Sequence, residues 1–233
     1  MTQSRFGISD TRLRSFLVAA RNLYHSNNPY HNFRHAFDVT HAIYVFLTTG
    51  QAAEKLTPLD IFAILVAGLC HDVDHPGVNN AFHVAVGSKI ALRYNDRSVL
   101  ENHHASLCFK KLLANPETNI CENLTSAQCR EFRQTVLQCI LATDMSLHME
   151  FSNKTGQLVE RGFQGTREDR LLLCTVLVKA ADVSNPCKPF LLSKSWSDLV
   201  IEEFFQQVRV VSASFCVCEC EGRCVVSDCD LTS

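Results

Sequence analysis

The sequence predicts an all-α protein, and three observations support this. Apolar residues in segments such as residues 13–24 recur at spacings of three and four, which is the period of a helix with one buried face. Several segments open with a residue type that caps helices, followed three positions later by an acid or an amide. No segment alternates apolar and polar residues convincingly over the length of a strand. We therefore expect one compact multi-helix domain.

The first expected helices are marked by periodicity and by a proline. In "TRLRSFLVAARNLY" one face would carry Leu13, Phe16, Leu17, Ala20 and Tyr24. In "LTPLDIFAILVAGLC" Thr57 is the expected N-cap, Pro58 suits the first helical position, and Asp60 places a negative charge in the first turn.

Three later helices are predicted by their capping patterns. Ser98 and Glu101 form the S-x-x-E pattern of a capping box, and Thr125 and Gln128 form T-x-x-Q. Thr166 precedes an acidic first turn. Stretches rich in proline, glycine and asparagine are expected to be loops, and these are "NNPYHN", "HPGVNN", "ANPETN", "NKTGQ" and "SNPCKP".

Composition narrows the class of protein. The 233 residues are 46% hydrophobic and 20% charged, with a formal net charge of −2, which is an ordinary globular mix. The sequence has no long block of one charge sign, which argues weakly against a nucleic-acid binder that works through a basic surface. The longest apolar run, residues 61–70, is too short to cross a bilayer, and the first ten residues lack the apolar core of a signal peptide. We expect a cytoplasmic protein without a membrane segment.

The twelve cysteines are unevenly distributed. Seven are scattered between residues 70 and 187, mostly in apolar helical patterns, where free cysteine acts as a small hydrophobe. That usage fits a reducing compartment. The last 18 residues hold the other five, which are Cys216, Cys218, Cys220, Cys224 and Cys229.

Ionisable residues gather in four clusters at expected helix ends or loops. Each cluster adjoins an apolar helical pattern, which is the layout expected when helices converge on a shared pocket. The clusters are "PYHNFRHAFDVTH" (29–41), "CHDVDHPGVNN" (70–80), "LENHHA" (100–105) and "ADVSNP" (181–186).

The two histidine-bearing clusters at residues 29–41 and 70–80 each allow a functional and a plain structural interpretation. On a helix, His31 and His35 would share a face and could bind one metal, or they could belong to a solvated helix start. His71 and Asp72 would diverge in mid-helix, but at a helix end before Pro76 both can reach one site. The alternative is a helix cap followed by a solvated loop.

The other two clusters are weaker when taken alone. Glu101 has a structural alternative as the acid of a capping box, and one of His103 and His104 would face solvent. Asp182 would usually be solvated at a helix end, but it would supply the second carboxylate that a metal site needs. The candidate metal ligands are two imidazoles and two carboxylates, and together they suit zinc or another borderline divalent ion. They are His35, His71, Asp72 and Asp182.

The order of these motifs resembles a known family. "YHNFRHAFDV", "CHDVDHPGVNN", "LENHHA", "LATDM" and "KAADVSNPCKP" are similar in order and spacing to the catalytic domain of class I 3′,5′-cyclic nucleotide phosphodiesterases, which are HD-type metal-dependent phosphohydrolases. The resemblance covers about residues 10–207 and includes "WSDLVIEEFFQQ". A bare HD pair would be weak evidence, but the ordered set is specific.

The resemblance implies a two-metal site and a role for most of the candidate residues. His35, His71, Asp72 and Asp182 match the zinc ligands, and Asp72 also matches the ligand of a second ion, Mg²⁺ or Mn²⁺. His31 matches the proton donor. Further matches are His75, Glu101 and His104, which support the ligands or orient water, and His31, Asp72, Asp182 and Asn185, which adjoin the substrate. No role is implied for Asp74.

The implied reaction is hydrolysis of cyclic AMP, cyclic GMP or both to the 5′-monophosphate in cyclic-nucleotide signalling. Two metals would generate the nucleophile and offset phosphoryl charge. His31 as imidazolium would protonate the leaving 3′-oxygen. A nearby carboxylate such as Glu101 would raise the pKa of His31 and hold its ring.

The resemblance stops near Gln207, where the family continues through helices that bind the base. We therefore expect residues 1–207 to form a partial phosphodiesterase catalytic domain whose C-terminal helices are missing, and residues 208–233 to form a divergent, irregular Cys-rich tail. Three interpretations of this tail stay open. It is translated non-coding sequence that begins at Val208, a thiolate metal-binding tail, or the end of a short isoform that acts by binding partners.

Missing helices would leave apolar surface exposed, and this predicts self-association. Two alternatives to the phosphodiesterase follow. One is a catalytically impaired fragment that acts by binding metal or a partner. The other is an HD-type phosphohydrolase of a non-cyclic nucleotide, against which the "YHN" and "SNP" clusters argue.

Overall fold

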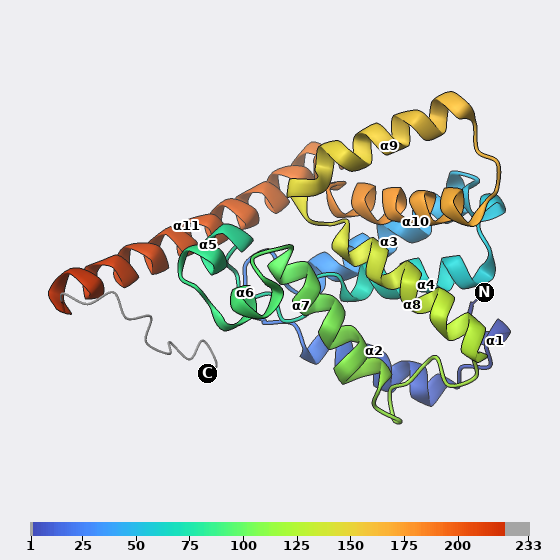
Figure 1. Cartoon of the computed structure of the whole chain (residues 1–233), viewed down its shortest axis with the longest axis horizontal. Helices are drawn as coiled ribbons and strands as arrows, with labels where there is room; N and C mark the ends of the chain where they lie inside the picture. Colours follow the sequence, from blue (N-terminus) through green and yellow to red (C-terminus); the bar gives the residue numbers. More distant parts are fainter. Residues whose placement is uncertain (1, 222–233) are drawn as a thin grey trace.

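The structure, a computed structural model, describes residues 2–221 and contains helices but no strand within that range (Figure 1). The all-α prediction is therefore confirmed. In chain order the elements are α1 (Thr2–Arg5), α2 (Asp10–Asn22), α3 (Phe33–Thr49), η1 (Ala52–Lys55), α4 (Pro58–Cys70), α5 (Asn80–Ala85), α6 (Lys89–Tyr94), α7 (Val99–Leu107), η2 (Cys108–Leu113), α8 (Ser126–Leu141), η3 (Met145–Leu147), α9 (His148–Arg161), α10 (Arg167–Asp182), η4 (Asn185–Cys187) and α11 (Phe190–Glu221).

Helix α4 lies at the centre of the core. It is apolar on all sides and packs against α3, α8 and α10, as expected for a helix without a solvent face. Gly68 lets α3 approach closely, because a Cβ there would lie 2.5 Å from Cδ1 of Ile43. The C-terminal end of α4, where the polar cluster at residues 70–80 begins, is thereby fixed against α3.

Several predicted helix starts have the expected caps. Thr57 accepts from the backbone N–H of Asp60 at 3.1 Å, and the Asp60 carboxylate accepts from the N–H of Thr57 at 3.1 Å. The box of Thr125 and Gln128 is also present, and Thr166 caps α10.

The predicted box of Ser98 and Glu101 is wrong. Ser98 has a φ of 41° and makes no capping bond. Its hydroxyl instead donates to Asp144 at 2.7 Å, and Glu101 turns to the amide of Asn80. A tertiary contact across 46 residues has replaced the local one.

Asp60 also ties α4 to α10, and this predicts a large effect on stability. Its carboxylate has no exposed surface and accepts from Arg167 and Arg170, each at 3.0 Å. Asp60→Ala removes one acceptor of the capping box and also removes the carboxylate that pairs with Arg167 and Arg170. We therefore expect the free energy of unfolding to fall by about 3 kcal/mol. Urea unfolding measures this. The exposed ion pair of Glu150 and Lys154 provides the control, since Glu150→Ala should change it by less than about 0.5 kcal/mol. Equal effects of the two substitutions would contradict this role for Asp60.

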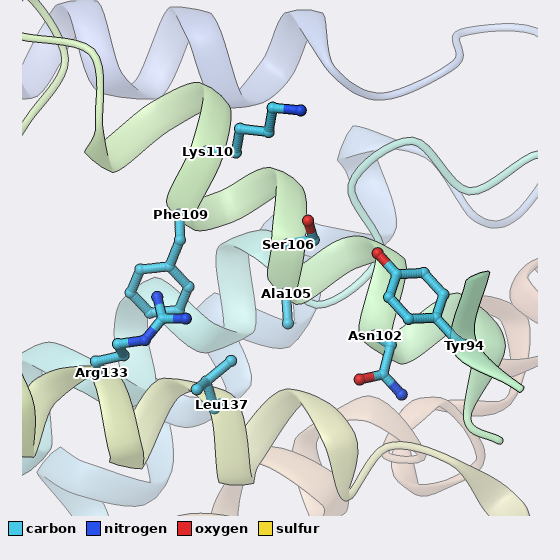
Figure 2. Close-up of a pocket in the computed structure, with 8 residues that line it drawn as sticks. All are labelled: Tyr94, Asn102, Ala105, Ser106, Phe109, Lys110, Arg133 and Leu137. Carbon is cyan, nitrogen blue, oxygen red and sulfur yellow. The ribbon is translucent and has the colours of Figure 1, made fainter. Parts of the chain in front are cut away.

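A π-helix, η2, continues α7 directly. Together with α6, α7 and α8 it lines a cavity of about 420 Å³, in which the guanidinium of Arg133 lies 4.2 Å from the centroid of the Phe109 ring (Figure 2). The residues that line this cavity include none of the site residues predicted from the sequence.

The C-terminal end of helix α11 extends beyond the rest of the protein (Figure 1). It continues without a break to Glu221, so residues 208–221 are helical and not irregular as expected. Residues 222–233 lie outside the described part of the chain, and the domain division at residue 207 stays a prediction.

The start of α11 exposes large apolar side chains. Phe190 and Leu191 are each 77% exposed. Self-association through this surface stays a prediction. Within residues 2–221, no helix has both the length and the apolar content that crossing a bilayer requires.

Candidate metal centre

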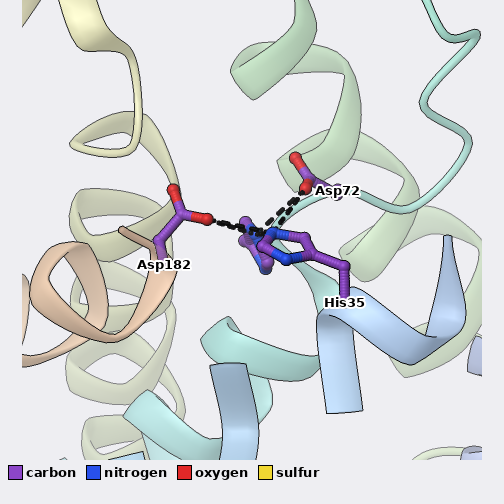
Figure 3. Close-up of side chains that lie close together, drawn as sticks. His35, Asp72 and Asp182 are labelled. Atoms are coloured by element: carbon purple, nitrogen blue, oxygen red, sulfur yellow. Dashed lines mark hydrogen bonds and ion pairs between the residues drawn. The ribbon is translucent and has the colours of Figure 1, made fainter. Parts of the chain in front are cut away.

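The four residues predicted as metal ligands come from three helix ends. His35 lies in the first turn of α3, His71 is the C-cap of α4 with Asp72 directly after it, and Asp182 is the last residue of α10. Figure 3 shows the side chains of His35, Asp72 and Asp182 converging from their separate elements. Segments that are 147 residues apart in sequence therefore meet at one point.

The ligand atoms of this cluster lie within 4.8 Å of one another. Nε2 of His71 lies 3.0 Å from Oδ2 of Asp72, 3.3 Å from Oδ1 of Asp182 and 3.2 Å from Nε2 of His35. Nε2 of His35 lies 3.0 Å from Oδ1 of Asp182 and 3.4 Å from Oδ2 of Asp72. Both imidazoles are buried. The arrangement is compact enough for one shared cation.

The donor chemistry fits a divalent metal ion. Nδ1–H of His71 donates to the carbonyl oxygen of Gly68 at 2.8 Å. This bond fixes the ring and leaves Nε2 as the free lone pair that faces the cluster. His35 also presents Nε2, which leaves two imidazole nitrogens and two carboxylates facing inward. Two nitrogen and two oxygen ligands suit zinc.

The charges within the cluster favour a positive centre. Burial alone would lower the pKa of His71, but the charges of Asp72 and Asp182 outweigh it and raise this pKa well above its usual value. Burial opposes ionisation of Asp72, yet the charge of His71 holds its pKa well below the usual range. The pKa of Asp182 is lowered in the same way. Both carboxylates therefore stay ionised.

Asp72 also faces a cavity of about 350 Å³ next to the cluster. Its Oδ1 lies 3.8 Å from Nε2 of His104, whereas its Oδ2 belongs to the cluster. One carboxylate therefore borders both the cluster and the cavity. Among the residues that line it are His31, Asp72, His75, Asn80, Glu101, His104, Thr143, Asp144 and Asp182.

Two of the three histidines that line this cavity, His75 and His104, are kept neutral. Burial lowers the pKa of His104 to about 4, and its Nδ1–H donates to the carbonyl oxygen of Val73 at 2.7 Å. Burial, with the charge of His31, holds the pKa of His75 well below its usual value, and His75 accepts from the N–H of Gly77 at 3.0 Å. Neither imidazole opposes a cation in the cavity by its own charge.

Glu101 lines the same cavity, but it does not hold His31. Burial raises the pKa of Glu101 to about 7, and its two oxygens accept from Asn80 at 3.2 and 3.0 Å. Our expectation that Glu101 would orient the His31 ring is therefore wrong.

The carboxylate that holds His31 is Glu203 of α11. Nδ1–H of His31 donates to Oε1 of Glu203, and the backbone N–H groups of Tyr30 and His31 each donate to Oε2 at 2.9 Å. Glu203 is only 3% exposed. His31 itself precedes α3, so a turn and not a shared helix face brings its ring centroid 5.9 Å from that of His35.

Glu203 stabilises the protonated form of His31. Burial alone would lower the pKa of His31, but the hydrogen bond to Glu203 and the charges of Asp72, Glu203 and Asp182 raise it above the usual value. The ring of His75 stacks on His31 at 3.9 Å between centroids. The bond to Glu203 therefore favours the protonated imidazole of His31 at the cavity and occupies its Nδ1.

This pair predicts a shift in pH dependence. If protonated His31 is required, activity falls as pH rises through its pKa. Glu203 raises that pKa, so Glu203→Gln should move the alkaline limb of the kcat profile to lower pH. Glu202→Gln is the control, because Glu202 is exposed on the same turn of α11. If the alkaline limb of the Glu203→Gln variant lay at the same pH as that of the parent, Glu203 would not control the protonation of His31.

Asn185 lies behind the cavity. Its amide nitrogen donates to the hydroxyl of Tyr30 at 2.8 Å, and its buried Oδ1 has no hydrogen-bond partner within residues 2–221. The Tyr30 ring lies 4.6 Å from that of His35 by centroids, and Trp196 contacts both rings. The residues that line the cavity do not include Asn185, so its role next to the substrate stays a prediction.

The chain matches known proteins over most of its length. The sequence profile of the family described as 3′5′-cyclic nucleotide phosphodiesterase matches residues 30–213. The chain is 48% identical over 204 residues to the 3′,5′-cyclic-nucleotide phosphodiesterase regA of Dictyostelium discoideum, which covers 87% of this chain and 26% of the relative. It is 39% identical over 229 residues to the human high affinity cAMP-specific and IBMX-insensitive 3′,5′-cyclic phosphodiesterase 8A, with 88% and 28% covered.

A solved structure agrees with these matches. The phosphodiesterase domain of the rhodopsin phosphodiesterase of Salpingoeca rosetta superposes with a TM-score of 0.87 at 39% identity, over 91% of this chain and 65% of that domain. The chain thus spans about a quarter of the length of the two curated relatives. The resemblance seen in the sequence is confirmed, and the chain belongs to the 3′,5′-cyclic nucleotide phosphodiesterase family.

Proposed function

We propose that this chain hydrolyses 3′,5′-cyclic nucleotides, cyclic AMP, cyclic GMP or both, to 5′-monophosphates in cyclic-nucleotide signalling. One observation carries the proposal above all. A buried cluster of two imidazoles and two carboxylates opens, through Asp72, on a cavity that also contains the His31 ring. Metal ligands and a cationic proton donor beside one cavity are the groups that hydrolysis of a phosphodiester needs.

His35, His71, Asp72 and Asp182 would hold a zinc ion, and Asp72 would share a second ion, Mg²⁺ or Mn²⁺. When bound, these ions supply positive charge for the phosphoryl oxygens and lower the pKa of an attacking water molecule. The family match and the converging donor atoms support this assignment. Zinc is favoured by the nitrogen ligands, and the more open, oxygen-rich side of Asp72 favours the harder ion.

His31 would act as the general acid. As the bond between phosphorus and the 3′-oxygen breaks, that oxygen needs a proton, because an unprotonated alkoxide is a poor leaving group. Nδ1–H of His31 is engaged by Glu203, so Nε2–H is the donor that remains. Asp72 and Asp182 would adjoin the phosphate, and Asn185 would support the pocket from behind Tyr30. Glu101 would orient a water molecule in the cavity.

The test is the identity and rate of product formation. The chain, supplied with Zn²⁺ and Mg²⁺, is incubated with cyclic AMP and with cyclic GMP, and the nucleotides are separated by chromatography. The proposal predicts the 5′-monophosphate and not the 3′-isomer. His35→Ala should abolish the product, and His41→Ala should not, because His41 lies exposed on the same helix. Turnover that survives in the His35 variant would contradict the proposal.

The comparisons do not support the alternative of a fragment that acts only by binding. A cytoplasmic location stays a prediction.

A further inference from the structure

We propose that Asp74 is a positioning residue for the second cation. It would act by fixing the turn that carries Asp72 and His75, and it touches neither substrate nor metal. The inference rests on the proposed function, because it assumes that Asp72 faces a cation in the cavity. The sequence assigned no role to Asp74, and the hydrogen bonds of its carboxylate give it one.

The backbone at Asp74 takes a conformation that few residues adopt. Its φ is 62°, in the left-handed region, where aspartate and asparagine are tolerated better than most side chains. This residue reverses the chain after α4, and the N–H of His75 donates back to the carbonyl oxygen of Asp72 at 3.1 Å. The conformation of one residue therefore decides how Asp72 and His75 are presented to the cavity.

Three hydrogen bonds hold this turn from two directions. The N–H of Asp74 donates to the carbonyl oxygen of Leu23 at 2.8 Å. Nε2–H of His25 donates to Oδ1 of Asp74 at 2.8 Å, and Nε2–H of His103 donates to Oδ2 at 2.7 Å. Both carboxylate oxygens are used, one toward the segment after α2 and the other toward α7. Backbone strain that is held in place by its surroundings is typical of functional sites.

The bond to His103 ties the turn to the part of α7 that faces the cavity. The next residue, His104, donates to the carbonyl oxygen of Val73 and places its Nε2 3.8 Å from Oδ1 of Asp72. Helix α7 therefore binds two consecutive residues of the turn, because His103 bonds to Asp74 and His104 bonds to Val73. Loss of either bond would displace Oδ1 of Asp72 relative to the cavity. Of the other three zinc-site residues, His35 and Asp182 lie on α3 and α10, away from the turn. His71 directly precedes Asp72, but its ring is held by a separate hydrogen bond to the carbonyl oxygen of Gly68 in α4.

The consequence is an unequal effect on the two cations. Because His35 and Asp182 lie outside the turn and the ring of His71 is held by Gly68, the zinc cluster should survive the loss of the Asp74 carboxylate. The second cation depends on Asp72 alone among the four zinc-site residues, so it should be bound more weakly. Outer residues that orient a metal ligand typically change affinity by about 10- to 100-fold when they are replaced.

The experiment compares Asp74→Asn with Asp96→Asn. Asparagine keeps the tolerance for a left-handed backbone but removes the charge and one acceptor. Asp96 is a matched control because its φ is 60° and it is exposed. In the described part of the chain, its side chain makes no hydrogen bond or ion pair. Zinc-loaded chains free of nucleotide are titrated with Mn²⁺ and followed by electron paramagnetic resonance, and zinc content is measured separately.

We expect Asp74→Asn to raise the Kd for Mn²⁺ at least about 10-fold while zinc content is kept, and Asp96→Asn to stay within about twofold, the scatter expected for a surface change. Saturating Mn²⁺ should restore kcat in the Asp74 variant, which a general loss of stability would not allow. Should Asp74→Asn fail to fold, His103→Ala removes only the α7 bond and should raise the Kd in the same direction.

Two negative results have different meanings. A parent chain that binds no Mn²⁺ would overturn the second cation site and this inference with it. A parent chain that binds Mn²⁺, together with Asp74→Asn and His103→Ala chains of unchanged Kd, would overturn the inference and leave the proposed function standing.

Discussion

Asp72→Ala should lower kcat/KM for cyclic nucleotides by at least about 10³-fold, because several kcal/mol of transition-state charge stabilisation depend on the metals. Oδ2 of Asp72 lies 3.0 and 3.4 Å from the two imidazole nitrogens of the cluster, and Oδ1 faces the cavity. One substitution therefore removes a ligand from each of the two proposed ion sites. Elemental analysis should find less bound metal in the variant than in the parent chain.

The control for this prediction is Asp198→Ala. Asp198 is an exposed carboxylate on α11 that pairs with Lys194, so metal content and turnover should match the parent. An Asp72 variant that kept more than a tenth of the parent turnover would mean that Asp72 is not shared between the two ions.

His31→Ala should lower kcat by about 10²- to 10⁴-fold, the usual contribution of a general acid, without loss of metal. His31 is not one of the four clustered ligands, and its Nδ1 is bonded to Glu203. The parent and the variant should therefore contain the same metal when both are analysed after the same purification.

The choice of leaving group separates this role from a structural one. A phosphodiester with a nitrophenolate leaving group needs little protonation, so His31→Ala should slow its hydrolysis far less than that of cyclic AMP. Equal losses for the two substrates would mean that His31 serves another purpose, such as holding Glu203 and α11 in place.

The parts of the fold that could be predicted from the sequence are those decided by local physics. Thr57 and Asp60 form their capping box within four consecutive residues, so the pattern alone suffices. The apolar run before His71 identifies a buried helix and also the point at which it ends. The four metal-ligand candidates were predictable because each lies in the first turn or at the C-terminal end of a helix, and the structure brings them together.

The rest depends on contacts between distant segments. Glu203 lies 172 residues from His31, on a helix where the neighbouring Glu202 has the same chemistry and only the helix phase decides which one is buried. Ser98 fits a capping pattern, yet its hydroxyl donates to the buried Asp144 and makes no bond to the backbone of α7. Asp74 looks like a solvated loop residue until His25 and His103, from two other segments, are placed around it.

The most direct test of the central claim is metal-dependent turnover by this chain. The chain is stripped with a chelator, restored with Zn²⁺ and then with Mg²⁺ or Mn²⁺, and formation of the 5′-monophosphate from cyclic AMP and from cyclic GMP is measured at each stage. The buried cluster predicts no product from the stripped chain, recovery when the metals return, and no recovery in Asp182→Ala. A parent chain that contains its full complement of metal and converts neither nucleotide would contradict it.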